Sequence, residues 1–310
     1  MRRQLCTIAV VMTAFLVVAS AQRGGPATPA ATGLAGRIAH TEPARFRASK
    51  SVHGGAGQLD FMSLLASNNF DTNMHFVHRG VLQPKGGIGA HFHNQCEEMF
   101  VILDGEAQFT IDGRTSVLKG PAGAPVRMGS SHAIYNHTDR PVQWLNLNVT
   151  ARKGVYDNFD LGDPRVDVPL DPIPQFISMR LDANTLRPLT ATKGTVRARR
   201  LLEPSVFRTA WAYVDHLSIA PGSVTNGQSL ADVGETFYVM SGEGAITVGA
   251  ERAAIREGDA IPVRMGETKS FESTGAAPLE LLVVGVARDA ARKFEMVQPL
   301  AGPGRGGRGN

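Results

Sequence analysis

Short apolar runs that end at turn residues recur along this chain. The runs 99–105 (MFVILDG) and 236–242 (TFYVMSG) each end at a glycine. The run 107–113 (AQFTIDG) alternates apolar and polar residues, and the run 245–249 (AITVG) does the same over a shorter length. Such runs, spaced closely and separated by Gly and Pro, are typical of short strands in a barrel or sandwich. The pattern therefore predicts an all-β fold.

The runs belong to an internal repeat whose two copies keep one constant offset along the chain. Pro84, Glu98 and Gly105 have counterparts at Pro221, Glu235 and Gly242, and the string PVRMG occurs at 125–129 and again at 262–266. A repeat of this length indicates two copies of one supersecondary unit. We expect one domain over residues 61–151 and a second over residues 198–288, with a connecting strap at 152–197.

The two ends of the chain differ in composition from the repeats. Residues 1–21 contain two arginines, an apolar run and a small-residue cleavage site, as a secretory signal peptide does. The apolar run, at 5–19, is shorter than the roughly 20 residues that a membrane-spanning helix needs. We therefore expect export to the periplasm or the extracellular space, with no stable membrane insertion after cleavage.

The segments next to the repeats have the composition of flexible chain ends. Residues 22–60 precede the first repeat, and their first part, 22–40, is rich in Ala, Gly and Pro, which predicts a flexible lead-in. Residues 289–310 are expected to form a flexible Gly/Arg-rich tail.

Charge and cysteine content narrow the functional classes. The net charge of +4 comes from arginines at the two ends, two near the start and two in the tail, so the rest of the chain is neutral and gives no indication of a nucleic-acid partner. The chain has two cysteines, and Cys6 would leave with the signal peptide. Cys96 then has no intramolecular disulfide partner.

Candidate chemistry is concentrated in the first repeat. His91 and His93 are separated by a single residue, so in a strand both imidazoles point to one face. Glu98 follows after a short turn, and His132 follows a later turn. Three imidazoles and one carboxylate that converge inside a barrel would form a metal site with positions left for a substrate.

These residues resemble the two sequence motifs of the cupin superfamily. The first motif is matched by Gly86 or Gly87, His91, His93, Glu98 and Gly105; the second is matched by Gly120, Pro125, Gly129, His132 and Asn136. The resemblance covers both repeats and implies a bicupin, that is, two jelly-roll β-barrels, with His91, His93, Glu98 and His132 as metal ligands.

The resemblance also implies a range of functions. It implies one divalent transition metal per chain, with Mn or Fe favoured and Zn, Ni, Co and Cu left open. It allows a metal-dependent dioxygenase, oxidase or decarboxylase acting on a small molecule, and alternatively a non-catalytic cupin that binds a small carbohydrate or acid. A homo-oligomer is also compatible with it.

Several other polar residues of the first repeat are weaker candidates. Asn136 and Cys96 are candidates for residues that contact the metal ligands without binding the metal, although the favoured interpretation of Cys96 is an inert loop cysteine. His75 and His78 fall on opposite faces of one predicted strand, so at most one points inward. The strand 141–149 has one polar face, with Trp144, Asn146 and Asn148, which faces either solvent or the cavity.

The second repeat has lost this constellation. The four ligand positions become Gln228, Leu230, Glu235 and Lys269, and Asn136 becomes Ser273. We therefore expect no transition metal in the second barrel. Because Glu235 and Lys269 occupy positions that converge in the first repeat, we expect them to form a buried ion pair.

Overall fold

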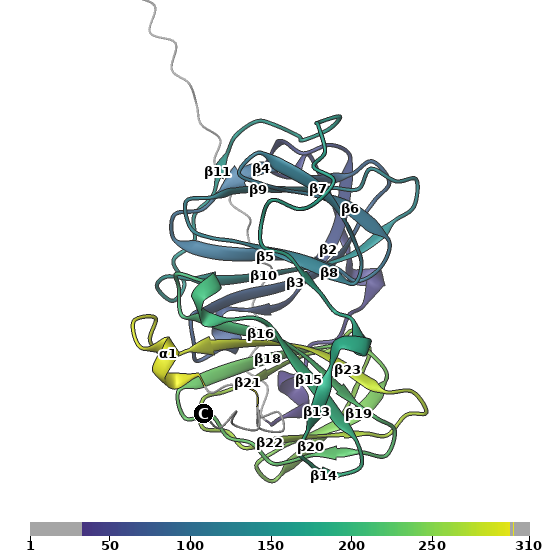
Figure 1. Cartoon of the computed structure of the whole chain (residues 1–310), viewed down its shortest axis with the longest axis vertical. Coiled ribbons are helices and arrows are strands. Elements are labelled where there is room, and N and C mark those ends of the chain that lie inside the picture. Colours follow the sequence, from purple (N-terminus) through teal and green to yellow (C-terminus); the bar gives the residue numbers. More distant parts are fainter. Residues whose placement is uncertain (1–32, 298–299, 301–310) are drawn as a thin grey trace, which may run out of the picture.

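Two antiparallel β-barrels lie against each other in the computed structural model, which describes residues 33–297 and 300 (Figure 1). All strand pairs within the named sheets are antiparallel, and each barrel is formed by two facing sheets. The prediction of two jelly-roll barrels from an internal repeat is confirmed. The predicted signal peptide and the end of the tail, 301–310, lie outside the described residues. No helix within the described part is long and apolar enough to cross a membrane.

The first barrel combines a seven-stranded and a five-stranded sheet. The larger sheet has the order β1 (Arg47–Lys50), β2 (Gln58–Ala66), β3 (Met74–Leu82), β10 (Val142–Thr150), β5 (Cys96–Ile102), β8 (Ala122–Val126) and β12 (Met179–Arg180). The smaller sheet has the order β11 (Phe159–Asp160), β4 (Gly87–Phe92), β9 (Ser131–Tyr135), β6 (Glu106–Ile111) and β7 (Arg114–Lys119).

The second barrel repeats this plan with a six-stranded and a five-stranded sheet. The larger sheet contains β13 (Arg187–Leu189), β15 (Val196–Leu202), β16 (Trp211–Ile219), β23 (Leu279–Ala287), β18 (Val233–Ser241) and β21 (Ala260–Val263). The smaller contains β14 (Ala191–Lys193), β17 (Val224–Thr225), β22 (Lys269–Ser273), β19 (Glu243–Val248) and β20 (Glu251–Arg256). Strands β3 and β16, like β10 and β23, begin and end at equivalent positions of the two copies, as the repeat predicts.

Short helical turns connect these strands. The described 3₁₀ turns are η1 (Ala35–Arg37), η2 (Pro43–Arg45), η3 (Val52–Gly54), η4 (Ser67–Asn69), η5 (Ala183–Thr185) and η6 (Pro204–Val206), and α1 (Lys293–Met296) follows the last strand.

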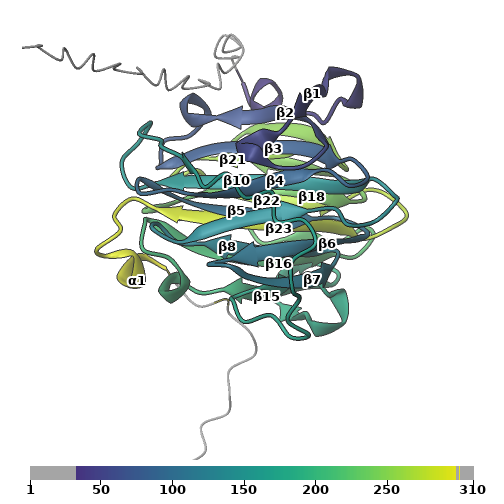
Figure 2. The ribbon, with the colours of Figure 1, turned by 90° about the horizontal axis from the view of Figure 1, so that it is seen from above.

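The larger sheets of the two barrels pack face to face and share one apolar core. Val77, Leu147 and Met99 of the first barrel belong to the same buried cluster as Trp211 and Leu282 of the second. Figure 2 shows the two barrels from above, with their strands overlying one another. Alternate residues of β3, β5 and β10 therefore point either into this shared core or into the interior of the first barrel.

Polar contacts add to this interface. The buried Glu97 carboxylate accepts hydrogen bonds from the Arg208 amide (2.8 Å) and from the Thr209 amide (2.8 Å) and hydroxyl (2.6 Å). Arg79 of β3 donates to the Tyr238 hydroxyl of β18 at 3.0 Å.

Two segments expected to be flexible are ordered over the residues that the structure describes. Leu34 and Ile38 are buried in the core of the second barrel, and Ala39 pairs with Ala260. At the other end, the Lys293 ammonium is buried and donates to the backbone carbonyls of Phe207 (2.5 Å) and Thr209 (2.9 Å). A few apolar or well-bonded residues are enough to fix segments whose average composition suggests flexibility.

The predicted connecting strap is ordered and crosses from the first barrel to the second. It adds β11 and β12 to the first barrel, and β13 and β14 to the second. An ion pair between Arg114 of β7 and Asp171, with a shortest distance of 2.6 Å, also holds it to the first barrel. Residues 155–160 of the strap therefore lie beside β4, next to the candidate site.

Candidate metal centre

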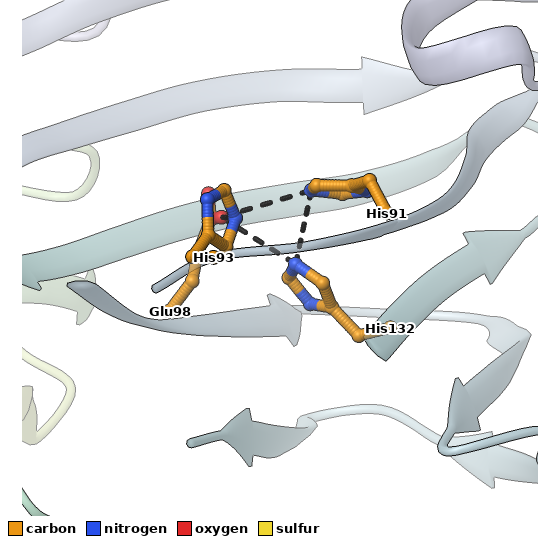
Figure 3. Close-up of side chains that lie close together, drawn as sticks. All are labelled: His91, His93, Glu98 and His132. Carbon is orange, nitrogen blue, oxygen red and sulfur yellow. Dashed lines mark hydrogen bonds and ion pairs between the residues drawn. The ribbon is translucent and has the colours of Figure 1, made fainter. Parts of the chain in front are cut away.

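Four side chains from both sheets of the first barrel converge on one point (Figure 3). His91 on β4 and His132 on β9 come from the smaller sheet, where they are register partners. Glu98 comes from β5 of the larger sheet, and His93 lies directly after β4. One ligand atom of each residue lies within 4.8 Å of the others, and all four side chains are buried. The structure thus brings together the four predicted ligands.

The Nε2 atoms of the three histidines surround one carboxylate oxygen. Glu98 Oε2 lies 2.6 Å from His93 Nε2, 3.5 Å from His132 Nε2 and 3.9 Å from His91 Nε2. The Nε2 atoms of His91 and His132 are 3.0 Å apart. Glu98 Oε2 and His93 Nε2 face each other in the middle of this group, and neither atom has a hydrogen bond to any other described residue, so a cation could take the place of the proton between them.

Backbone carbonyls set the tautomer of two of these rings. His91 Nδ1 donates to the Gly89 carbonyl at 2.8 Å, and His93 Nδ1 donates to the Asp157 carbonyl at 2.5 Å. A proton on Nδ1 leaves the Nε2 lone pair free, which is the form that binds a metal. Asp157 is itself held by the amides of Asn94 (3.0 Å) and Gln95 (2.9 Å).

The electrostatics of the cluster favour the metal-binding forms of Glu98 and His132. Burial alone would raise the pKa of Glu98, but the neighbouring His93 and the other two imidazoles lower it well below its usual range. Burial, together with His91, lowers the pKa of His132 to about 3. Burial also disfavours the charge on His93, but the Glu98 carboxylate outweighs it and raises the pKa of His93. A divalent cation would replace the proton that His93 holds against Glu98.

This donor set fits a divalent first-row transition metal. Three imidazole nitrogens and one carboxylate oxygen suit Mn, Fe, Co, Ni, Cu and Zn, and the geometry selects none of them. His93 also belongs to a second, smaller group of possible ligands, with Cys96 and Asp157. The ligand atoms of these three residues lie within 4.8 Å of one another.

The two candidate supporting residues occupy different places. Cys96 is the first residue of β5, fully buried, and its Sγ accepts a hydrogen bond from Asn148 Nδ2 at 3.1 Å. It is therefore an interior strand residue beside the ligands, and burial raises the pKa of its thiol. Asn136 donates instead to the carbonyls of Leu82 (3.0 Å) and Arg140 (2.7 Å), which fixes the turn after β9.

A small cavity adjoins the ligands on one side. It encloses about 20 Å³ and is lined by His91 and Glu98 among other residues. Asn146 and Trp144 of β10 line it as well, which places the polar face of that strand in the barrel interior. Asn146 Nδ2 donates a short hydrogen bond to Glu98 Oε1, so this amide orients the carboxylate.

The two weaker histidine candidates, His75 and His78, have different surroundings, as their spacing along the strand predicts. His78 lines the cavity and stacks on Phe76 at 4.0 Å, and burial lowers its pKa to about 4. His75 stacks instead on Tyr156 at 5.4 Å. His137, which follows Asn136, points away and pairs with Glu106 at 3.2 Å.

Two residues that close the cavity were not found from the sequence. His53 of η3 stacks on His91, with 3.9 Å between the ring centroids, and its Nδ1 lies 2.5 Å from Asp160 Oδ1 on β11. Tyr156 comes from the strap and lines the same cavity. Neither belongs to a motif. The only signal was a cluster of aromatic and acidic residues at 155–160, which does not indicate where the strap folds.

The equivalent point in the second barrel holds a buried ion pair. Lys269 Nζ contacts Glu235 Oε2 closely, and both side chains are buried, as predicted. The Tyr213 hydroxyl donates to Glu235 Oε1 at 2.8 Å. Gly285 makes room for this ring, because a Cβ there would lie 2.3 Å from a tyrosine carbon. An ammonium group thus occupies the place where the first barrel could hold a metal ion.

Fold and site together define a two-barrel protein with one metal-type centre and one degenerate centre. The Cupin domain model matches residues 78–148 and 215–285, which are equivalent ranges of the two repeats. The chain belongs to the cupin superfamily and is a bicupin.

Similar proteins include both enzymes and a binding protein. An oxalate-binding protein of Thermotoga maritima is 26% identical over 114 residues, which cover 37% of this chain and 92% of that protein. Salicylate 1,2-dioxygenase from Pseudoaminobacter salicylatoxidans, solved as an adduct with gentisate, has a TM-score of 0.60 at 14% identity, covering 76% of this chain and 75% of that one. Oxalate decarboxylase from Bacillus subtilis has a TM-score of 0.57 at 15% identity, covering 81% and 76%. At these identities the two structures establish only the shared fold.

Proposed function

We propose that this protein is an exported mononuclear-metal enzyme that acts on a small molecule, with dioxygenase- or oxidase-like chemistry first and decarboxylation second. The observation that carries the proposal is the buried group His91, His93, Glu98 and His132, one side of which faces a small cavity. A metal ion held there would act as a Lewis acid and as the redox centre of the reaction. We favour Mn or Fe as that ion, and one ion per chain.

The surrounding residues prepare the site for a bound molecule. Asn146 holds the Glu98 carboxylate, and the carbonyls of Gly89 and Asp157 hold the His91 and His93 rings. His53 and Tyr156 line the cavity beside the ligands. A pre-oriented ligand set beside a cavity fits catalysis, because the donors need no rearrangement during the reaction.

The metal content of the purified protein is the first test. Elemental analysis should find about one transition-metal ion per chain, and Glu98→Gln should reduce it strongly. Two ions per chain would contradict the assignment of a degenerate second barrel.

Activity is the second test. The metal-loaded protein should consume oxygen or release carbon dioxide with at least one member of a panel of small acids, phenols and sugars, and the Glu98→Gln variant should not. Metal binding without turnover across the panel would favour the second candidate, a non-catalytic cupin that binds a small acid or carbohydrate. The match to an oxalate-binding protein supports that candidate.

Export is proposed from the composition of the segment 1–21. Amino-terminal sequencing of protein recovered outside the cytoplasm should begin near residue 22. An intact amino terminus in the cytoplasmic fraction would contradict it.

A further inference from the structure

Two buried polar atoms belonging to wall residues of the cavity have no hydrogen-bond partner within the described chain. They are the indole Nε1 of Trp144, which can only donate, and the amide Oδ1 of Asn146, which can only accept. Trp144 is 1% exposed and Asn146 6% exposed. Because unpaired buried polar atoms are rare, a bound molecule that pairs with both would remove a free-energy cost.

The orientation of the Asn146 amide is fixed by its other contact. Its Nδ2 donates to Glu98 Oε1, and an ionised carboxylate can only accept. Turning the amide over would place its oxygen against the Glu98 oxygen, so Oδ1 remains the unpaired atom. A molecule bound beside Asn146 therefore needs a hydrogen that it can donate.

The charges around the cavity limit the charge of that molecule. Its described lining contains no lysine or arginine, and Glu98 is its one carboxylate. A divalent ion beside Glu98 would leave a net charge of about +1. A singly charged molecule would neutralise it, whereas a dianion would leave a negative charge buried without a partner.

The rest of the wall is apolar and largely aromatic. The apolar and aromatic lining residues are Val52, Leu59, Phe61, Phe76, Ile88, Phe100, Trp144 and Tyr156. Flat ring surfaces pack well against a flat ring, by stacked or edge-to-face contacts.

We propose that the substrate of this site is a planar aromatic molecule with two adjacent oxygen substituents, one of which keeps its proton, as in a catechol. The proton-bearing oxygen would donate to Asn146 Oδ1, and an oxygen of the molecule would accept from Trp144 Nε1. The ring would lie between the aromatic walls. This assignment rests on the proposed function, since it places the oxygen edge towards the metal ligands.

Such a molecule needs more room than the cavity has in this structure. A cavity of about 20 Å³ holds roughly one water molecule. Most of the lining comes from strands β2, β3, β4, β5 and β10, whereas Val52, His53 and Tyr156 come from η3 and the strap. To admit a ring, these three residues would have to be displaced, and the His53–Asp160 contact joins the two segments that carry them.

The test is anaerobic titration calorimetry on the metal-loaded full chain with catechol, lactate and oxalate. Lactate is a singly charged chelator without a ring, and oxalate is a dianion without a hydrogen to donate. We expect catechol to bind at least tenfold more tightly than either. Trp144→Phe keeps a ring but removes Nε1, and should weaken catechol binding by about threefold to tenfold, as expected for one lost hydrogen bond.

A reciprocal pair of variants tests the charge argument. Phe61 is only half-buried, so Phe61→Arg can place a cation in the wall without disrupting the core. It should strengthen oxalate binding, whereas the neutral control Phe61→Gln should not.

The outcomes separate the two proposals. Oxalate binding as tight as that of catechol, or no binding of catechol to metal-loaded protein, overturns the substrate assignment and leaves the metal centre intact. A chain that retains no metal overturns the proposed function and the substrate assignment with it.

Discussion

Removing the Lys269 ammonium group from the second barrel should destabilise the protein strongly, although the group is small. Lys269 and Glu235 have side-chain exposures of only 4% and 7%, so neither charge is solvated by water in the folded state. In Lys269→Met the apolar stem is retained but the charge is lost. Among the described residues, the Glu235 carboxylate then keeps the Tyr213 hydroxyl as its one hydrogen-bond partner.

The size of the effect follows from the cost of an uncompensated buried charge. Breaking a buried ion pair by removing one partner costs about 3–5 kcal/mol. Because the Tyr213 hydrogen bond remains, we expect the lower end, about 3 kcal/mol. The double variant Glu235→Gln/Lys269→Met removes both charges. Its free energy of unfolding should be within about 1 kcal/mol of the wild-type value or higher than it.

Urea unfolding at pH 7 measures these free energies directly, provided that the slope with denaturant is unchanged. Arg288→Met is the matched control, because the Arg288–Asp232 pair is exposed, with side-chain exposures of 59% and 41%. Its loss should cost between zero and about 1 kcal/mol. If Lys269→Met is no more destabilising than this control, Lys269 does not compensate Glu235 and the explanation of the degenerate site is wrong.

Three further predictions concern the first barrel. Burial holds the pKa of His78 at about 4, below its unfolded value of 6.5, so the contribution of neutral His78 to stability is present above pH 6.5 and is lost as the pH falls towards 4. In the wild type, the urea midpoint should therefore fall between pH 7 and pH 5, and His78→Gln should make this fall smaller. An equal fall in the variant would refute the assignment. Asp160→Asn should weaken the contact that joins η3 to the strap and speed exchange of the Val52–Gly54 amides in hydrogen-exchange measurements, with Asp139→Asn, an exposed substitution, as control. Asn146→Ala should reduce metal affinity by about tenfold to a hundredfold in a chelator competition, because Glu98 loses the amide that orients it; equal affinities would show that the amide has no such role.

The sequence was most informative where the internal repeat and the motif spacing could be used together. The constant offset between the two copies predicted which strands correspond, and the metal-ligand positions of the first repeat identified Glu235 and Lys269 as neighbours although they lie on separate strands. The first inference depends on the constant offset alone, and the second also uses the two-residue period that sets side-chain direction along a strand.

Contacts made by irregular segments could not be predicted in this way. His53 and Tyr156 reach the cavity from segments that are distant in the sequence, and no periodic pattern relates them. Leu34 and Ile38 are isolated apolar residues in an Ala/Gly-rich stretch, so their burial depends on apolar contacts that only the folded second barrel provides. The local composition gives the average hydrophobicity of a segment, and it does not show which distant residues the segment contacts.

Two consecutive glutamates on β5 link the candidate chemistry to the contact between the barrels. Glu98 faces the imidazoles, and its neighbour Glu97 faces the opposite way and is anchored by the backbone of residues 208–209. A shift of the second barrel that displaced those amides would therefore pull on the strand that carries Glu98. The barrel without a metal-type centre thus supports the strand that carries Glu98, and substitutions at this contact, far from the four ligands, are expected to alter metal binding.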